Sequence, residues 1–290
     1  MKKIDHIIAP GSAHMVGDGF RVNNFIPSAI GLDMHRMNPF IMLDYNQKME
    51  VLPSNTPRGV GVHPHRGFET VTIAYRGRIA HHDSGGGGGV IGEGDVQWMT
   101  AASGVLHKEY FEENFAREGG IFQMVQLWVN LPAKDKMSPP KYQAIPKEKM
   151  GKYILEDGLG QVEIIAGTYN GVEGPAFTHT PVHLYNARLQ KGGKASFSFP
   201  AAYSTALLVI EGEIKVNNSD QVPESHFVLF GTQGEEFEIE ATENALVLVL
   251  GGEPIPEPIA AHGPFVMNSR EELIQAFNDY NDGKFGYLAD

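Results

Sequence analysis

The sequence predicts an all-β protein made of two tandem barrels, with one short helix near the C-terminus. Three observations support this fold class. Segments rich in β-branched and aromatic residues alternate with glycine-rich turns, the strand-and-turn pattern occurs twice along the chain, and one segment close to the C-terminus has helical periodicity. A chain of 290 residues is long enough for two domains and a substantial buried core.

The first barrel is predicted from strands that alternate with turns. The run FETVTIAY, residues 68–75, has the composition of a strand and ends at a turn, residues 76–78. A second turn, residues 92–95, precedes the strand VQWMT, residues 96–100, and a third turn leads into a strand that begins at Val105. This order of strands and turns is typical of an antiparallel barrel.

Two pairs of metal-type ligands lie at the ends of these strands. His63 and His65 open the run HPHRGFET, and His107 and Glu109 follow about forty residues later in GVLHKE. Because alternate residues of a strand share one face, each pair presents two ligands to the same side, and two such strands of a small barrel can surround one ion. The sequence therefore predicts a mononuclear metal site.

The ligand types limit the metal without identifying it. Three neutral imidazoles and one carboxylate, without a thiolate, suit iron, manganese, copper, nickel or zinc rather than an iron–sulfur cluster. In a six-coordinate sphere these four ligands would leave two exchangeable positions, which is compatible with an enzyme. A structural zinc site would be closed and would usually contain cysteine, and the chain has none.

The second barrel is predicted from an internal repeat. When Gly77 is set against Gly212, HPHRGFETVTIAYRGRI lies over SFPAAYSTALLVIEGEI without gaps, and apolar and turn positions coincide. Ser198 and Pro200 then occupy the places of the first histidine pair, and no histidine between residues 226 and 262 can replace the second. We infer a second barrel that has lost its metal ligands.

The domain boundary is predicted in the stretch NLPAKDKMSPPKYQAIPKEKMG, where prolines and charges interrupt the strand pattern. This linker runs from about Pro132 to Gly151. The predicted domains are residues 1–135, which would bind the metal, and residues 136–290, which would not.

A C-terminal helix over about residues 269–280 is predicted from its capping box and its periodicity. Ser269 and Glu272 form the capping box. Apolar residues then recur at helical spacing: Leu273, Ile274, Phe277 and Tyr280. We expect this amphipathic helix to pack against the protein; docking of a partner is the alternative.

These residues resemble the two motifs of the cupin superfamily, HxH with a nearby Glu and GxxH, which are HPHRGFE and GVLH in this chain. More narrowly, HPHRGFETVT, IGEGDVQWMTA, HKE and the distant HGPFVMNSREELIQAFNDY together resemble the pirin family of two-domain cupins. The resemblance spans nearly the whole chain. It implies two cupin barrels, also described as double-stranded β-helices or jelly rolls.

Two departures from the general cupin pattern agree with the pirin pattern. Ala102 and Phe111 replace the usual Pro and Asn of the second motif. The usual carboxylate ligand would be Glu69, whereas the pirin pattern places it at Glu109, which shares a strand face with His107. We therefore expect Glu109 as the ligand; Glu69 is the alternative, as a ligand or as a partner of one.

The resemblance also implies an activity of the quercetin 2,3-dioxygenase type, in which molecular oxygen opens the ring of a flavonol. Glu109 would then be both a ligand and the catalytic base that takes the proton of the flavonol 3-hydroxyl. The expected cofactor is one divalent transition metal, first Fe(II), with manganese, copper, nickel, zinc or cobalt as alternatives. The competing hypothesis is a metal-dependent regulator, either a transcriptional cofactor or a protein that binds a metabolic enzyme.

Composition narrows the partners. A net charge of −12 repels the phosphate backbone, so we expect no direct binding of nucleic acid. No stretch approaches eighteen consecutive apolar residues, and the first residues do not resemble a signal peptide, so we expect no membrane association and a cytoplasmic protein, also nuclear in a eukaryote. No sequence pattern favours a dimer, and we expect a monomer.

A run of five glycines, Gly85–Gly89, is predicted to be a flexible loop between strands. It lacks the lysine and the Ser/Thr of a phosphate-binding loop. His81 and His82 precede this run, and we expect both side chains to be solvated.

Overall fold

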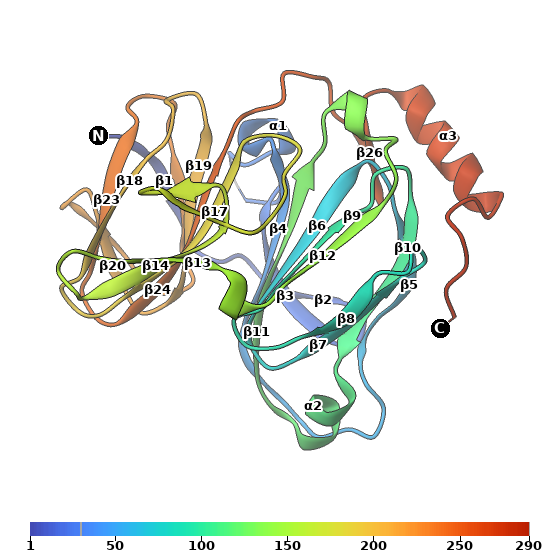
Figure 1. The fold of residues 1–290 in the computed structure, drawn as a ribbon, viewed down its shortest axis with the longest axis horizontal. Helices are drawn as coiled ribbons and strands as arrows, with labels where there is room; N and C mark the ends of the chain where they lie inside the picture. The colour runs from blue at the N-terminus through green and yellow to red at the C-terminus, as the bar shows by residue number, and fades with distance from the viewer. Residues whose placement is uncertain (30, 290) are drawn as a thin grey trace. The chain divides into compact units, whose positions relative to one another are not determined.

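The computed structural model describes residues 1–29 and 31–289, which form two compact units built mainly of β-strands (Figure 1). We call Ser12–His35, Pro39–Lys147 and Ile255–Asp290 the histidine barrel, because this unit contains the HPH motif. We call Met1–Gly11, Arg36–Asn38 and Glu148–Pro254 the aromatic barrel. The predicted all-β fold with two cupin barrels and a short C-terminal helix is confirmed.

The histidine barrel contains a seven-stranded sheet of order β12-β9-β6-β11-β4-β3-β2 and a four-stranded sheet of order β5-β10-β7-β8. Its strands are β2 (His14–Val16), β3 (Phe20–Ile26), β4 (Phe40–Val51), β5 (Gly59–His65), β6 (Phe68–Arg76), β7 (Ile79–Asp83), β8 (Gly88–Ile91), β9 (Val96–Thr100), β10 (Val105–Phe111), β11 (Gly120–Asn130), β12 (Lys141–Ile145), β25 (Ala260–His262) and β26 (Phe265–Met267). Its helical segments are α2 (Glu113–Glu118), η1 (Ala133–Asp135) and α3 (Arg270–Asn281).

The aromatic barrel repeats this plan. It has a seven-stranded sheet of order β1-β22-β19-β24-β17-β14-β13, a four-stranded sheet of order β18-β23-β20-β21 and the hairpin β15-β16. Its strands are β1 (Ile4–Ile8), β13 (Gly151–Ile154), β14 (Gly160–Ala166), β15 (Thr168–Tyr169), β16 (Val172–Glu173), β17 (Val182–Leu189), β18 (Lys194–Ser198), β19 (Ser204–Glu211), β20 (Ile214–Val216), β21 (Asp220–Val222), β22 (Phe227–Phe230), β23 (Glu236–Ala241) and β24 (Ala245–Gly252). Two short helices, α1 (Met34–Met37) and η2 (Lys147–Lys149), stand where the chain passes between the units.

The units do not coincide with the predicted ranges 1–135 and 136–290. Strand β1 pairs with β22 in the aromatic barrel, and β12, inside the predicted linker, pairs with β9 in the histidine barrel. The C-terminal segment from Ile255 also belongs to the histidine barrel. In Figure 1 the dark blue N-terminal strand accordingly runs among orange strands. Local composition indicates where the chain passes from one domain to the next. It does not show which sheet a strand far away in the sequence will join at its edge.

The predicted capping box is confirmed at α3. The Ser269 hydroxyl accepts from the Glu272 amide, and the Glu272 carboxylate accepts from the Ser269 amide. The helix packs as expected, but with a shifted face: Leu273 and Ala276 face the barrel. Ile274 is 52% exposed, since the buried stripe follows one side of the helix only.

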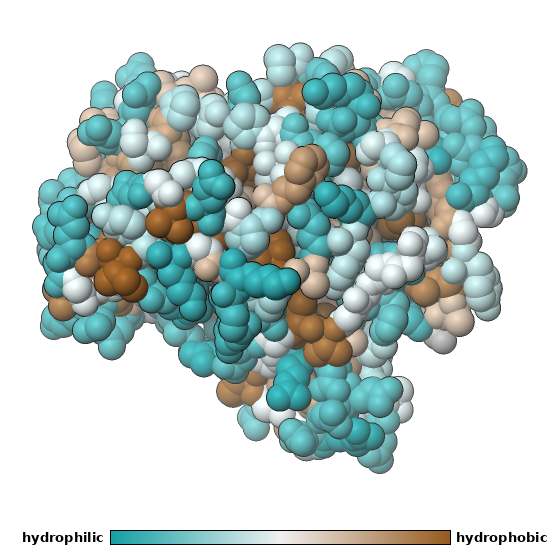
Figure 2. Space-filling model, in the orientation of Figure 1, coloured by the Kyte–Doolittle hydropathy of each residue, from teal (hydrophilic) through white to brown (hydrophobic). Residues whose placement is uncertain are grey.

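Most of the surface seen in Figure 2 is hydrophilic, and its hydrophobic residues form separate groups. No helix among the described residues is both long and apolar enough to span a lipid bilayer.

Candidate metal centre

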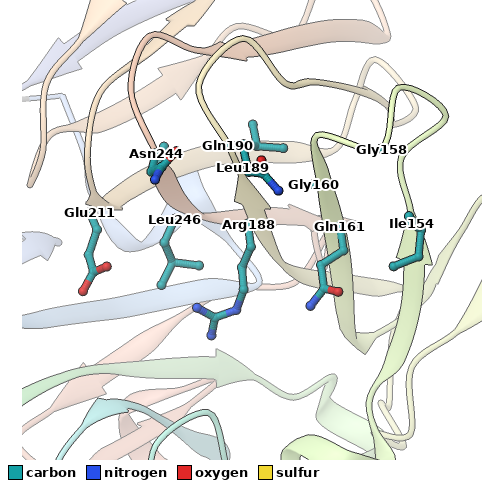
Figure 3. A pocket seen from close by; sticks show the side chains of 11 residues that line it. Ile154, Gly158, Gly160, Gln161, Arg188, Leu189, Gln190, Glu211, Asn244 and Leu246 are labelled. Carbon is teal, nitrogen blue, oxygen red and sulfur yellow. The ribbon is translucent and has the colours of Figure 1, made fainter.

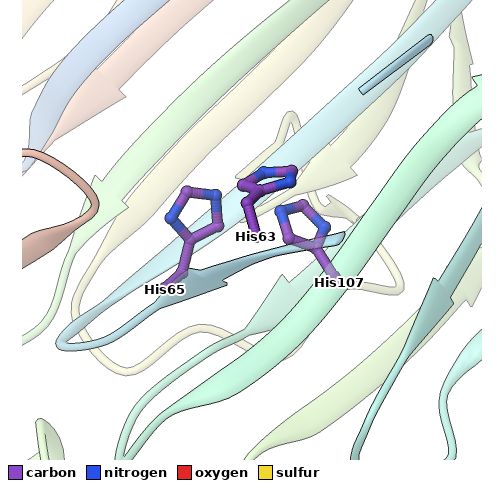
Figure 4. A group of neighbouring side chains, drawn as sticks. All are labelled: His63, His65 and His107. Carbon is purple, nitrogen blue, oxygen red and sulfur yellow. The ribbon is translucent and has the colours of Figure 1, made fainter. Parts of the chain in front are cut away.

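The first histidine pair meets the second across two neighbouring strands. β5 and β10 pair antiparallel with His63 opposite His107, and residues opposite each other in such a pair lie on the same face of the sheet. The His107 ring centroid lies 4.1 Å from that of His63 and 4.7 Å from that of His65. Figure 4 shows the three rings gathered between the two strands. The structure therefore brings the three predicted histidines together.

The tautomers of His63 and His65 follow from their hydrogen bonds. Nδ1 of His63 lies 2.8 Å from the carbonyl oxygen of Gly61, and Nδ1 of His65 lies 3.3 Å from that of Pro264. A carbonyl oxygen can only accept, so both Nδ1 atoms carry the proton. In the neutral form of either ring the lone pair is then on Nε2, the atom available to an ion.

His107 is also held through Nδ1. Its Nδ1 lies 2.9 Å from Nε2 of His81, and its own Nε2 is buried without a hydrogen-bond partner. A buried polar atom without a partner costs about 1–3 kcal/mol. Among the described residues, no hydrogen bond reaches Nε2 of His63, His65 or His107. Three Nε2 atoms on one face are thus left uncommitted.

Burial keeps the imidazoles of His65 and His107 neutral. The pKa values of His65 and His107 lie well below the ordinary value, first because burial disfavours the charged ring and second because neighbouring histidines repel a proton. Neutral imidazole is the form that binds a metal. The site is therefore ready to bind an ion at neutral pH without losing protons from these rings.

Glu109 supplies a buried carboxylate beside the histidines. Its side chain accepts hydrogen bonds from the Thr72 hydroxyl (3.1 Å) and from the Gln126 amide (2.7 Å), one on each oxygen. Burial raises the pKa of Glu109, although His63 and these hydrogen bonds oppose the rise. Thr72 and Gln126, the hydrogen-bond donors to this buried carboxylate, are uncharged, and a bound cation would provide a positive partner.

The four predicted ligands do not form a single group. The candidate ligand atoms of His63, His65 and His107 lie within 4.8 Å of one another, and so do those of His81, His107 and Glu109. His107 belongs to both groups. Both lie in the histidine barrel, and no further group of this kind occurs among the described residues.

The expectation that His81 is solvated was wrong, whereas His82 is exposed. His81 is fully buried because it stands opposite Glu109 in the pairing of β7 with β10, which turns its ring inward. Burial lowers its pKa to about 3, so this ring is neutral as well. The alternation in IAHHD, with Ile79, His81 and Asp83 on one face, is the signal that could have identified it.

Glu69 lies on the opposite face of its strand from the metal centre. It is three residues before Thr72, whose hydroxyl reaches Glu109, and successive strand residues alternate between faces. The Thr100 hydroxyl donates to Glu69 over 2.6 Å, and burial raises the Glu69 pKa to about 7. The structure does not support Glu69 as a ligand or as a partner of one.

Part of the glycine run belongs to a strand, whereas the sequence predicted a loop throughout. Gly88 and Gly89 begin β8, and the Asp83 carboxylate accepts from the amides of Gly85 and Gly87, both at 2.8 Å. A Cβ on Gly87 would collide with the Asp83 carboxylate, so a residue without a side chain is required there. The run folds around the end of β7, next to His81.

In the aromatic barrel the gap-free alignment is off by one residue. Ser198 is exposed and points outward, whereas Phe197 and Phe199 point into the barrel. Phe197 stands opposite Phe237, and the two rings stack with centroids 5.2 Å apart. The interior position that holds two histidines in one barrel holds two phenylalanines in the other.

Two cavities lie in the aromatic barrel, and neither includes a predicted ligand. One, of about 470 Å³, is lined from β14, β17 and β24; in Figure 3 Gln161, Arg188 and Leu246 line it side by side. Its cation is already paired, since Nε of Arg188 lies 3.0 Å from both oxygens of Glu163. The other, of about 580 Å³, lies beside Ser198 and Phe199. Cavity volume alone therefore does not identify the candidate metal centre.

Comparison with known proteins agrees with this geometry. Residues 19–129 match the family model "Pirin", and residues 184–286 match the "Pirin C-terminal cupin domain". The chain is a member of the pirin family. A pirin-like protein of Solanum lycopersicum is 36% identical over 275 residues, covering 93% of this chain and 89% of that protein.

Two further relatives bear a more specific name. A "putative quercetin 2,3-dioxygenase" of Pseudomonas aeruginosa is 46% identical over 285 residues, covering 98% of this pirin and 99% of the relative. The crystal structure of a quercetin 2,3-dioxygenase from Acinetobacter baumannii superposes with a TM-score of 0.93, at 44% identity and complete coverage of both chains. These similarities support a dioxygenase-like enzyme of the pirin type.

Proposed function

We propose that this pirin is a metal-dependent dioxygenase that opens the ring of a flavonol-like substrate with molecular oxygen. The ligands are His63, His65, His107 and Glu109. The observation that carries the proposal is that each of the three rings has its Nδ1 engaged and its Nε2 free on one shared face. The names of the Pseudomonas and Acinetobacter relatives support the reaction class.

The donor set fits a single divalent transition metal, with Fe(II) as our first choice. When bound, such an ion would supply a Lewis acid with exchangeable coordination positions. His81 would hold His107 with Nε2 toward the ion, as carbonyl oxygens hold the other two rings. The buried carboxylate would gain a positive partner.

Glu109 is also the proposed base. Burial raises its pKa above the ordinary carboxyl value, which increases its affinity for the proton of an acidic hydroxyl. Thr72 and Gln126 fix its two oxygens. The proton of the flavonol 3-hydroxyl would pass to this carboxylate.

Aromatic side chains next to the histidines suit a planar substrate. The Trp128 ring is partly exposed and lies 5.1 Å from the His65 ring, centroid to centroid, and it stacks on Phe68 at 4.2 Å. A flat apolar surface beside the ligands offers stacking to a polycyclic phenol.

The test combines metal analysis with oxygen uptake in the presence of quercetin, for the wild type and for His63→Ala. His82→Ala is the matched control, because His82 is an exposed histidine of the same barrel. We expect one metal per chain and flavonol-dependent uptake in the wild type and the control, and neither in His63→Ala. Metal without uptake would contradict the dioxygenase and favour the regulatory hypothesis; uptake retained by His63→Ala would overturn the site.

Glu109→Gln tests the base. The Gln126 amide can donate to the new carbonyl and the Thr72 hydroxyl can accept from the new amide, so we expect the fold to persist. Turnover should fall at least about 100-fold, the lower end of what a general base contributes. Unchanged metal content together with an unchanged rate would remove both roles of Glu109.

A further inference from the structure

The segment from His262 to Ala289 contacts each stretch of chain that carries a histidine of the metal centre. It includes β26 and α3 and belongs to the histidine barrel, although it lies about 200 residues from the HPH motif in sequence. In Figure 1 the red helix stands at the edge of this barrel near β10 and β26. We call His262–Ala289 the C-terminal clasp.

The clasp first contacts the HPH strand. The Pro264 carbonyl accepts from the Arg66 amide (3.3 Å) as well as from Nδ1 of His65, and the Val266 amide donates to the Arg66 carbonyl (3.0 Å). These bonds attach the clasp beside β5 in a short parallel bridge. The carbonyl that fixes the tautomer of His65 therefore comes from the clasp.

The Arg66 side chain then joins the clasp to the turn before β10. Its guanidinium donates to Asp279 of α3 (2.8 Å) and to the Ser103 carbonyl (2.7 Å), and it lies 4.7 Å from the centre of the Phe285 ring. The ion pair is buried, with Arg66 4% and Asp279 7% exposed. Removing one partner of a buried pair leaves an uncompensated charge, so this contact fixes the geometry strongly.

Phe285 contacts the strand that carries His107. Its ring occupies the space beside Gly104, where a Cβ would meet it at 2.6 Å. Its carbonyl accepts from the Ser84 hydroxyl, which in turn accepts from the amide of Leu106, the residue before His107. Leu106 also packs into the apolar cluster of the clasp.

A buried lysine completes the attachment. Nζ of Lys136 donates to the carbonyls of Gly67 and Val266 and to the side chain of Asn130, at 2.7–2.9 Å. Three donors meet three acceptors, which satisfies the ammonium group. Gly67 has a positive φ of 89°, and a Cβ there would collide with the Val266 carbonyl. The turn after the HPH strand is therefore shaped to receive the clasp.

We propose that the C-terminal clasp is a working part of the metal centre, in which Pro264, Asp279 and Phe285 act as positioning residues for the ligands His65 and His107. The proposal rests on the metal site of the proposed function. Coupling between two sites is reciprocal, so a clasp that raises metal affinity must itself be held more firmly when metal is bound. A clasp that only covers the barrel would stabilise the protein without changing affinity for the ion.

Zn²⁺ affinity, measured by competition with a chromophoric chelator, tests the first half of this coupling. Asp279→Asn and Phe285→Leu should weaken Zn²⁺ binding by about 10–100-fold, the usual effect of removing support from a metal ligand. Ile274→Ala is the control, because Ile274 lies on the exposed side of the same helix. We expect its affinity to stay within about twofold of wild type, since surface substitutions change free energies by less than about 0.5 kcal/mol.

Hydrogen exchange tests the second half of this coupling, and its main comparison, the unmodified protein with and without Zn²⁺, does not depend on how a variant folds. Zn²⁺ should slow exchange of the amides of α3 in the wild type, and this slowing should disappear in His63→Ala. The clasp proposal alone would be overturned if both clasp variants bound Zn²⁺ with wild-type affinity, or if Zn²⁺ did not change hydrogen exchange in α3. Failure of the wild type to bind stoichiometric Zn²⁺ would instead overturn the metal site on which it rests.

Discussion

The two barrels share one architecture and differ in what they place at one interior position. Each has a seven-stranded and a four-stranded sheet. In one, His63 stands opposite His107; in the other, Phe197 stands opposite Phe237. The cupin framework therefore does not need an ion to hold its sheets together. The side chains facing inward decide whether the interior can act chemically.

The interiors also differ in how their polar groups are satisfied. The aromatic barrel contains a large buried apolar cluster, which includes Phe197, Phe237 and Val249. The histidine barrel buries polar side chains as well as apolar ones, among them Thr72, Glu109, His81 and His107. Burying polar groups without full pairing costs stability, and Nε2 of His107, one of the buried atoms without a hydrogen-bond partner, is a proposed ligand atom. The histidine barrel thus combines apolar packing with a candidate binding site.

The largest expected effect comes from giving the histidine barrel the interior of its partner. His107→Phe should abolish stoichiometric metal binding and reduce flavonol-dependent oxygen uptake to background, because His107 belongs to both ligand groups. The metal-free protein should remain folded, at a cost of about 1–3 kcal/mol for leaving Nε2 of His81 unpaired. Metal content, chelator competition and urea unfolding measure these effects. Retention of one metal per chain would show that His107 is not required.

A substitution inside the aromatic barrel should lower stability without changing the metal content. Phe237→Ala should lower the free energy of unfolding by about 3–5 kcal/mol, as expected for a fully buried phenylalanine in a packed core. Metal content should be unchanged, since Phe237 belongs to the other unit. Urea unfolding with metal analysis on the same samples provides the measurement. A loss of metal in a folded variant would contradict the independence of the two interiors.

Whether a feature of the metal centre can be predicted from the sequence depends on how far apart its contacting residues lie along the chain. The i, i+2 spacing in HPH and HKE was sufficient to place four side chains on inward faces, because alternation along a strand is a local property. The role of His81 was missed, because the alternation in IAHHD shows which residues share a face but not that this face lies opposite Glu109 in the pairing of β7 with β10. The shared carbonyl of Pro264 lies 199 residues from His65, and no local pattern predicts that contact.

The choice between two carboxylates gives a third prediction. Glu69 has a raised pKa of about 7 in the folded protein against 4.5 ordinarily, so its contribution to stability is complete below about pH 4.5 and is lost as the pH rises through 7. The loss is about 3 kcal/mol, from 1.36 kcal/mol per pKa unit. Glu69→Gln keeps the acceptor for Thr100 and should remove this pH dependence.

The metal affinities of two variants should distinguish the role of Glu69 from that of Glu109. Because Glu69 lies on the other face of β6, Glu69→Gln should bind the metal as tightly as the wild type, whereas Glu109→Gln should not. Urea unfolding at pH 5 and pH 8 and chelator competition provide the two readouts. Weakened metal binding in Glu69→Gln would show that Glu69 contributes to the metal centre.

The smallest effect is expected at a position that the gap-free alignment equates with a ligand. The gap-free alignment sets Ser198 over His63, so Ser198→His would restore a ligand if that alignment described the structure. Ser198 is exposed and faces outward, and a surface substitution changes stability by less than about 0.5 kcal/mol. We therefore expect unchanged stability and no additional metal by metal analysis and urea unfolding. A second equivalent of metal would mean that β18 turns the face carrying Ser198 inward, which would contradict the stacking of Phe197 on Phe237.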